Sequence, residues 1–505
     1  MNKLKVLMEL RPAGDGFAGI PQETRILFSQ LRAMDDLHVT GLLNFHQNWA
    51  GGIEDAKNPG SDLIFKRSRA VLALADLQGT RWSRYAGRLY QKLSQPLRLA
   101  LLRAIGRPLR VHELDMSPFA DFVWRSYFSR SLAASEFERV TGAAFASIKP
   151  SWEAMQRIGK SFLLPPGAYL QMDTSAYDVY LSQTPFPARI SSRTQLVVRF
   201  HDAIPIFYPH TIHNARWHQF THYYPLRSNL KQGAILVCNS ENSRKEALAM
   251  FPGAEAQTRV IPCVVSDEYY PEDTSREMIC DIVKSGIEAH TEPSFPGAQA
   301  ADRFYSRHLQ PASFRYVMMV STIEPRKNHA RLLAAWNLIR TSGNPNLKLI
   351  FVGTPGWNYR DIVAAMKPFQ QRGMLFNLSR LSPGDLRRLY AGAEAVICPS
   401  IAEGFDLSGI EAMLSGAAVA ASDIPVHREI YRDACEYFSP YSTKQAADAI
   451  LRIIGSDGTE NKRRLIERGA EIGKAYRRES IGGIWGEFFE ELKARRYRPG
   501  SGEDA

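Results

Sequence analysis

The sequence predicts an α/β fold with more than one hydrophobic core. The chain has 505 residues, of which 45% are hydrophobic, and chains of this length commonly divide into two domains. Short apolar runs that are typical of buried strands precede amphipathic helical segments in both halves, for example at 195–200 and at 316–320. Ligands of open α/β sheets bind at the carboxyl ends of the strands, so the loops that follow these runs are where we look for function.

The N-terminal segment is the first to show this alternation. Residues 3–8 predict a strand, and a helix is expected from about Pro21 to Met34, with a proline at its start as an ordinary helix signal. The loop between them contains Gly16 and Gly19, and glycines would let a ligand approach the backbone closely. A mobile surface turn is the alternative interpretation of this loop.

Two carboxylates in the C-terminal half are separated by seven residues. Glu403 follows a predicted buried strand, and Glu411 lies on the second turn of a helix expected from Leu407 onward. Ser408 and Glu411 also match the S-x-x-E capping box, which would give Glu411 a purely structural role at the helix end. The glycine beside Glu403 favours a binding site, because it permits close contact between a ligand and the backbone.

A pair of cations is predicted at the end of another strand. The apolar run 315–320 leads into Ser-Thr-Ile-Glu-Pro-Arg-Lys-Asn, which places Arg326 and Lys327 before an amphipathic helix. Cations at a helix N-terminus oppose the helix dipole, and such residues are often only surface charges. A bound diphosphate would remove the conflict, because charge-assisted contacts to phosphate contribute roughly 1.5–3 kcal/mol each.

Together these motifs resemble the large group 1 family of retaining, nucleotide-sugar-dependent glycosyltransferases of the GT-B type. The similarity extends over about 177–475, and it is closest to the mannosyltransferase-like branch of bacterial O-antigen and exopolysaccharide synthesis. It rests on the Glu-Pro-Arg-Lys-Asn run at 324–328, on Pro-Ser-x-x-Glu-Gly-Phe at 399–405 with its second glutamate, and on Gly-Ala-Ala-Val-Ala-Ala-Ser-Asp-Ile-Pro at 416–425. The resemblance implies two Rossmann-like domains facing a cleft, with a helical insertion in the N-terminal domain.

The resemblance also implies roles for individual residues. Glu403 would contact the donor sugar and its reacting face, and Glu411 would accept hydrogen bonds from the ribose hydroxyls. Arg326 and Lys327 would balance the charge of the leaving diphosphate. His201, which follows a predicted strand, would bond a sugar hydroxyl or the leaving phosphate, with a structural histidine as the alternative. Further contacts are expected from the segment Gly404, Phe405, Asp406, Leu407 and Ser408 with the donor, and from Gly16 and Gly19 with the acceptor or donor.

Two positions depart from the family pattern. Ser321 and Thr322 stand where many members have Gly-Arg, so Arg326 is expected to take over the load of the missing arginine. Asp406 replaces the glycine that is most common after Glu-Gly-Phe. It would either select among sugar hydroxyls or cap the following helix, and we favour the cap.

No metal and no cofactor are expected. Many glycosyltransferases hold a divalent metal with an Asp-x-Asp pair, and no two aspartates of this chain are separated by one residue. The cations of the Arg-Lys pair would neutralise the diphosphate instead, which predicts a metal-independent enzyme. Four histidines are assigned no chemistry: His210, His213, His218 and His222.

The segment 81–110 is basic and amphipathic. It contains eight arginines and lysines and no acidic residue, against a formal net charge of +11 for the whole chain. Apolar residues share one helical side of it, namely Trp82, Tyr85, Leu89 and Leu93, and continue after Pro96 with Leu97, Leu101, Leu102 and Ile105. This composition predicts a helix that lies on an anionic membrane surface. The alternative is a helix that packs its apolar side on the N-terminal domain and leaves its arginines in water.

The remaining features predict a cytoplasmic protein, peripheral at the inner face of the plasma membrane. Five cysteines, an odd number lying mostly in apolar runs, indicate reduced and buried side chains. The first residues are too few and too soon charged for a signal peptide, and no apolar run reaches the ~18 residues that span a bilayer.

We therefore expect an N-terminal acceptor domain over 1–308, with a basic helical insertion at about 51–175 and a linker at about 271–312. A C-terminal nucleotide-sugar domain would cover 309–476, with a closing helix and tail at 477–505. The expected function is retaining transfer of a hexose, with mannose from GDP-mannose as first choice, to a lipid-linked or other glycan acceptor of a bacterial surface polysaccharide. A sugar-nucleotide epimerase of the same architecture is one alternative. A basic nucleic-acid-binding protein is the other, but no nucleic-acid reader motif is present, so no nucleic acid is expected as a partner.

Overall fold

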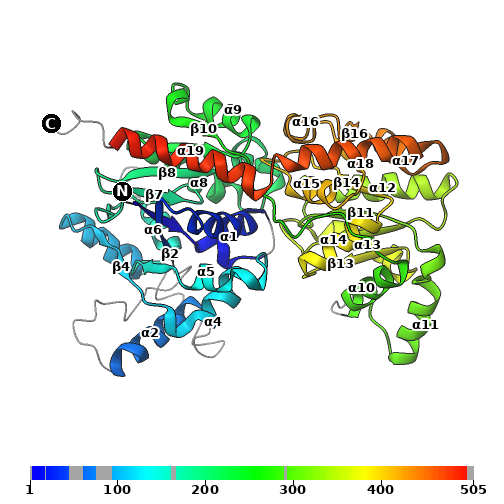
Figure 1. Cartoon of the computed structure of the whole chain (residues 1–505), viewed down its shortest axis with the longest axis horizontal. Coiled ribbons are helices and arrows are strands. Elements are labelled where there is room, and N and C mark those ends of the chain that lie inside the picture. Colours follow the sequence, from blue (N-terminus) through cyan, green and yellow to red (C-terminus); the bar gives the residue numbers. More distant parts are fainter. Residues whose placement is uncertain are drawn as a thin grey trace.

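The computed structural model describes residues 3–16, 19–44, 61–75, 94–160, 167–288 and 293–496. Within these ranges the chain forms two large sheets, one in each half of the molecule, and helices flank both sheets (Figure 1). The N-terminal half holds an eight-stranded sheet and the C-terminal half a six-stranded sheet. A small two-stranded sheet joins β3 (Leu109–Arg110) to β6 (Met172–Asp173).

The N-terminal sheet has the strand order β10-β9-β8-β7-β1-β2-β5-β4. Its neighbours pair in parallel, except that β4 and β5 are antiparallel. Alternate residues of β1 pack into the hydrophobic cores on opposite sides of the sheet. Val6 and Met8 belong to one core and Leu7 to the other, as expected for a sheet that is covered on both sides. The strands are β1 (Leu4–Glu9), β2 (Leu37–Leu43), β4 (His112–Glu113), β5 (Ala144–Ser147), β7 (Val179–Ser182), β8 (Gln195–Phe200), β9 (Ile235–Cys238) and β10 (Thr258–Val260).

The segment 51–175, expected to be a helical insertion, contributes strands as well as helices. Its strands β4 and β5 extend one edge of the N-terminal sheet, because β5 pairs in parallel with β2. Part of the predicted basic segment, 81–93, lies outside the described residues; its continuation forms a helix over 94–104. The other helices of this half are α1 (Gly19–Arg32), α2 (Ser61–Leu74), α4 (Ala120–Val123), α5 (Phe137–Thr141), α6 (Trp152–Ile158), α7 (Ile204–Phe207), α8 (Ala215–Lys231) and α9 (Glu241–Met250).

The C-terminal sheet is parallel throughout, with the order β13-β12-β11-β14-β15-β16. From β11 the chain adds β12 and β13 on one side of the sheet, and it then returns to add β14 on the other side of β11. The strands β11 and β14 therefore lie side by side although β12 and β13 intervene in sequence. Open α/β sheets bind ligands at such a switch point. The strands are β11 (Tyr316–Val320), β12 (Lys348–Val352), β13 (Leu375–Leu378), β14 (Ala395–Cys398), β15 (Val419–Ser422) and β16 (Cys435–Phe438).

The segment 271–312, expected to be an extended linker, contains two helices. The first, α10 (Arg276–Glu288), buries Ile279, Val283 and Ile287 in the C-terminal core, because these residues recur at helical spacing on one side. The second, α11 (Ala298–His308), follows it. The helices beyond them in this half are α12 (His329–Thr341), α13 (Arg360–Gln371), α14 (Pro383–Gly392), α15 (Leu407–Leu414), α16 (Pro425–Tyr431), α17 (Thr443–Ile454) and α18 (Thr459–Lys474).

The last helix, α19 (Arg478–Arg496), returns to the N-terminal half, where Figure 1 shows it in red. Its side chains Ile481, Trp485 and Phe488 are buried in the core that also contains β1 and α1. The chain thus crosses between the halves twice, once before α10 and once between α18 and α19. Across the described ranges, no helix has the length and apolar character needed to span a membrane.

Candidate active site

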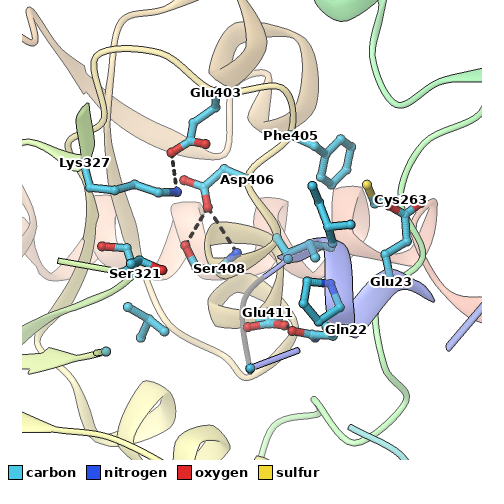
Figure 2. A pocket seen from close by; sticks show the side chains of 18 of the residues that line it. Gln22, Glu23, Cys263, Ser321, Lys327, Glu403, Phe405, Asp406, Ser408 and Glu411 are labelled. Atoms are coloured by element: carbon cyan, nitrogen blue, oxygen red, sulfur yellow. Dashed lines mark hydrogen bonds and ion pairs between the residues drawn. The ribbon is translucent and has the colours of Figure 1, made fainter. Parts of the chain in front are cut away.

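A cavity of about 580 Å³ lies between the two halves of the molecule, and both contribute to its walls. Every site residue proposed from the sequence lines it, which brings together positions nearly four hundred residues apart in the chain. These are Gly16, Gly19 and His201 from the N-terminal half, and Arg326, Lys327, Glu403, Gly404, Phe405, Asp406, Leu407, Ser408 and Glu411 from the C-terminal half. Figure 2 shows those that it labels, namely Lys327, Glu403, Phe405, Asp406, Ser408 and Glu411. The roles given to these residues stay predictions.

Glu403 is buried between the two predicted cations. Its Oε2 accepts a hydrogen bond from Arg326 Nη1 at 2.7 Å, and its Oε1 lies 2.5 Å from Lys327 Nζ. Arg326 also pairs with Glu324 at 2.7 Å. Burial alone would raise the pKa of Glu403, but the charges of Arg326 and Lys327 outweigh burial and lower it. The carboxylate is therefore ionised, and both cations are held at the cavity wall.

Asn328 fixes the loop that carries the cations. Its backbone is left-handed, with φ of 64°, a conformation that asparagine adopts more readily than most residues. Its side-chain amide donates to the carbonyls of Pro399 and Pro440 at 3.0 and 2.8 Å. Ile401 N donates in turn to Arg326 O at 2.9 Å. These bonds tie the loop after β11 to the loop after β14, and so they set the distance between the cations and Glu403.

Glu411 is buried on α15 and makes its contacts across the cavity. Gln22, from the first turn of α1, donates to Glu411 Oε1 at 2.6 Å, and the Tyr390 hydroxyl lies 3.3 Å from Oε2. Figure 2 shows Gln22 next to Glu411. Burial raises the pKa of Glu411 to about 7. Glu411 does not serve as a capping residue, so the capping-box interpretation is wrong at this position.

The cap of α15 is Asp406. Its Oδ1 accepts from the Ser408 backbone N–H at 3.2 Å and from the Ser408 hydroxyl at 2.6 Å. Its Oδ2 lies 3.3 Å from Nε2 of His427, a fully buried side chain whose Nδ1 donates to the Ser422 carbonyl at 2.9 Å. Burial would raise the pKa of Asp406, but the contact with His427 and the charge of Lys327 lower it. The favoured sequence interpretation, a helix cap, describes this geometry.

Gly404 meets the N-terminal half directly. A Cβ at this position would lie 1.8 Å from His201 O and 2.9 Å from Asp202 Cβ, so no side chain fits there. The carbonyl of Gly404 accepts bonds from the hydroxyls of Ser240 and Ser243 at 2.8 and 3.2 Å. The sequence suggested that this glycine lets a ligand approach; in the structure it lets the other half of the protein approach.

His201 follows β8, as predicted, but both of its ring nitrogens face protein groups. Nε2 donates to the Gln183 carbonyl at 3.0 Å, and Nδ1 lies 3.3 Å from Glu23 Oε2. Glu23 also pairs with the buried Arg199, whose Nε lies 2.9 Å from Glu23 Oε1. Burial lowers the pKa of His201, although Glu23 opposes that change. The structural alternative for His201 thus has a concrete basis, and Glu23 and Arg199 are neighbours that sequence reasoning missed.

The glycine loop before α1 is held by arginines. Arg25 donates to the carbonyls of Ala13 at 2.9 Å and Gly16 at 2.8 Å, and Arg130 donates to the Asp15 carbonyl at 2.7 Å. Arg25 is buried, and it extends from the second turn of the same helix that the loop precedes. These bonds hold the described part of the loop against the cavity, where a mobile turn was the alternative expectation.

Other residues of the cavity wall were not proposed as site residues from the sequence. They include Gln22, Glu23, Asp202 and Trp357, and also His222, to which the sequence analysis assigned no chemistry. The sequence does contain a feature that could have identified His222. His218 and His222 are four residues apart, which puts both on one side of α8. Among the described residues, no group of three or more histidine, cysteine, aspartate or glutamate side chains could hold a metal ion.

The two α/β halves that face each other across the cavity have the GT-B fold. The structure superposes on sucrose-phosphate synthase from Thermosynechococcus elongatus with a TM-score of 0.58, at 15% identity, covering 98% of this chain and 100% of that one. For Anabaena HepE in complex with UDP-glucose the TM-score is 0.53, at 14% identity, covering 97% and 100%. At these identities the likeness establishes the fold alone, and it confirms the predicted fold class.

Residues 303–472 match the family of glycosyl transferases group 1, so this part of the chain is a glycosyltransferase group 1 domain. The serotype-specific mannosyltransferase WbdA of Escherichia coli is 34% identical over 163 residues, which are 32% of this chain and 20% of that protein. The O-antigen chain mannosyltransferase B of Escherichia coli is 30% identical over 142 residues, or 28% and 37% of the two chains. The match thus spans about a fifth to two fifths of these relatives.

Proposed function

We propose that this protein transfers a hexose from a nucleotide-diphosphate sugar to a growing, lipid-linked bacterial surface polysaccharide, with retention at the anomeric carbon. Mannose from GDP-mannose is the first candidate donor, and the names of the relatives support this choice. The observation that carries the proposal is the convergence of Arg326, Lys327, Glu403 and Glu411 on one cavity between the two halves.

The cations and acids have complementary parts in this reaction. An arriving diphosphate competes with Glu403 for Arg326 and Lys327, and the two cations then stabilise the charge that develops as the bond from the anomeric carbon to the phosphate oxygen breaks. Glu403, a buried carboxylate in the same cluster, stabilises the positive charge on the sugar ring. Glu411 accepts bonds from the ribose hydroxyls in place of the Gln22 amide.

Retention follows when the acceptor hydroxyl attacks from the face that the diphosphate leaves. The hydroxyl oxygen forms the new bond to the anomeric carbon, and its proton passes to an oxygen of the departing diphosphate. Walls from both halves of the protein keep water away from this step, which limits hydrolysis of the donor.

A nucleotide screen tests the proposal. A ligand that binds only the native state raises the apparent unfolding temperature, so GDP, UDP, ADP and CMP should be compared by thermal shift. The best nucleotide is then supplied as its sugar donor, with and without a glycan acceptor. A glycosylated acceptor of retained configuration supports the proposal. Conversion of the donor alone into an isomer would indicate the epimerase alternative, and no stabilisation by any nucleotide would refute both.

We further propose that no divalent metal is required. The paired cations at the cavity wall carry two positive charges, the number that one such ion would supply. Transfer activity is therefore expected to persist in excess EDTA, measured as product formed per minute after dialysis against the chelator. A strict requirement for added magnesium or manganese would contradict this expectation.

The described part of the basic segment supports a peripheral position at the inner face of the plasma membrane. The helix over 94–104 buries Leu99 in the N-terminal core, but Leu97 and Leu101 on the helix and Ile105 in the turn after it are exposed, with 69%, 63% and 55% of their surfaces accessible. These three residues recur every fourth position on one side, and arginines flank them in sequence. An anionic lipid surface would accept the apolar side chains among its acyl chains and attract the arginines through its headgroups. A lipid-linked acceptor would lie in that surface.

A further inference from the structure

One end of the cavity takes no part in the reaction as described so far. It is formed by the start of α7, by α8 and by the loop after β12, and its lining residues are Ile204, Pro205, His222 and Trp357. Asp202, two residues before Ile204, packs directly against Gly404, since a Cβ added to this glycine would lie 2.9 Å from Asp202 Cβ, so this end is next to the Glu403 loop. Under the proposed function, a ligand placed here would lie beside the donor that Glu403 contacts.

His222 presents a hydrogen-bond acceptor at this end. Its Nδ1 lies 2.9 Å from the carbonyl of His218, one helical turn earlier, and a carbonyl can only accept, so Nδ1 carries the proton. Burial lowers the pKa of His222, with the charge of Asp202 opposing, which favours the neutral ring. In that tautomer Nε2 has a lone pair that can accept a bond from a hydroxyl.

Trp357 supplies a flat apolar surface beside α8, the helix that carries His222. It belongs to the C-terminal half, yet its ring centroid lies 5.0 Å from that of His218 on α8, so the two halves touch through these rings. The indole remains 36% exposed while it lines the cavity. Aromatic rings of this kind pack against the C–H faces of sugars, and the rim hydroxyls then reach polar neighbours.

We propose that His222 and Trp357 form the subsite for the acceptor's terminal sugar, a neutral hexopyranose ring at the end of a glycan. Trp357 packs against one face of the ring, and His222 accepts a hydrogen bond from one of its hydroxyls. Ile204 and Pro205 complete the apolar wall. This subsite rests on the proposed glycosyl transfer and adds the class of acceptor and the residues that select it.

Direct binding of simple glycosides tests the subsite. The probes are octyl α-D-mannopyranoside, octyl α-D-glucopyranoside and octyl α-D-galactopyranoside, titrated into the full chain in the presence of saturating nucleoside diphosphate and followed by saturation-transfer NMR. At least one probe should bind the unmodified protein. His222→Phe and Trp357→Ala are each expected to raise its Kd about tenfold, more than they raise the Kd of the nucleotide.

Conservative variants separate this role from a structural one. Trp357→Phe keeps an aromatic face and His222→Gln keeps a hydrogen-bond acceptor. Each should therefore retain most of the glycoside binding that Trp357→Ala or His222→Phe, respectively, loses. His213→Ala, an exposed histidine that does not line the cavity, is the matched control. Circular dichroism and thermal unfolding confirm that each variant is folded.

Results that contradict the acceptor subsite differ from results that contradict the proposed function. No binding of any glycoside, an unchanged Kd in both disruptive variants, or a loss confined to nucleotide affinity would each overturn the acceptor subsite. The last result would assign these residues to the donor instead. Failure of every nucleotide to bind the unmodified protein is a different result, and it would refute the proposed function itself.

Discussion

At the scale of single residues, the site consists of polar and charged side chains that bind one another. Glu403 holds Arg326 and Lys327, and Glu411 holds Gln22. Each of these side chains is buried or half-buried, so leaving any of them unpaired would cost several kcal/mol. Under the proposed function, the donor replaces these internal bonds with bonds from its own diphosphate and ribose hydroxyls.

Lys327→Ala is expected to lower kcat by on the order of 10²-fold, because it removes one of the two cations that we propose stabilise the leaving diphosphate. Steady-state kinetics with a saturating donor measure the effect. Lys444→Ala is the control, since Lys444 is exposed on α17 and pairs only with Asp448 there. A kcat equal to that of the unmodified protein would remove Lys327 from the mechanism.

The raised pKa of Glu411 predicts that the free energy of unfolding depends on pH. Its pKa in the folded protein is about 7, above its usual value of 4.5, because burial disfavours the ionised form. The folded state therefore binds the proton more tightly than the unfolded state does. This contribution to the free energy of unfolding is fully present below about pH 4 and is lost as the pH rises through 7. The loss amounts to about 3 kcal/mol at most.

Replacing Glu411 by glutamine should remove that loss. Between pH 5 and pH 8 the unfolding free energy of Glu411→Gln, measured in urea, is expected to rise relative to that of the unmodified protein. Glu460→Gln, at an exposed carboxylate on α18, provides the comparison in which no such change is expected. Parallel stability curves for Glu411→Gln and the unmodified protein would mean that Glu411 titrates normally.

At the scale of elements, the sequence predicted the regular parts well and the contacts between them poorly. The strand before Glu403 and the helix from Leu407 form as expected, because apolar period and cap residues are local signals. The Gln22–Glu411 bond joins residues 389 positions apart, and nothing local marks either partner. Local patterns likewise missed α10 and α11, since the prolines between them resembled a linker.

The exposed side of the 94–104 helix gives a prediction for membrane binding. Leu101→Glu is expected to weaken sedimentation with vesicles rich in phosphatidylglycerol by about tenfold, because it removes one exposed leucine that would insert into the lipid and adds a repelled charge. Leu338→Glu on α12 is the matched control, since Leu338 is also exposed, at 41%, and lies on the other half of the molecule. Equal sedimentation of all three proteins, or no preference for anionic over neutral lipid, would exclude this helix as the contact.

At the scale of the whole molecule, the two halves form one site only while they touch. Their contact includes the Gly404 carbonyl with Ser240 and Ser243, and the carboxylate of Glu429, which accepts from the first N–H groups of α9 at 2.7 and 3.0 Å. The resemblance to a two-domain family predicted a cleft, but it could not predict which loops meet across it. That information lies in side-chain packing between distant segments.

Gly404→Ala tests this contact. The added methyl group would overlap His201 O, so the halves are expected to separate slightly, with a loss of transfer activity of at least tenfold and a larger radius of gyration by X-ray scattering. Gly483→Ala, at an exposed helical glycine of α19 with no atom within 4 Å of the new group, should preserve both properties. Full activity with an unchanged radius would show that the contact has no part in turnover.

The bond between Gln22 and Glu411 bears on how a reaction cycle ends. Under the proposed function, the ribose of the spent nucleotide and the Gln22 amide compete for the same glutamate once the sugar has been transferred. The amide is carried by the first helix of the protein, so re-forming its bond to Glu411 would favour release of the product. The rate of release would then depend on Gln22.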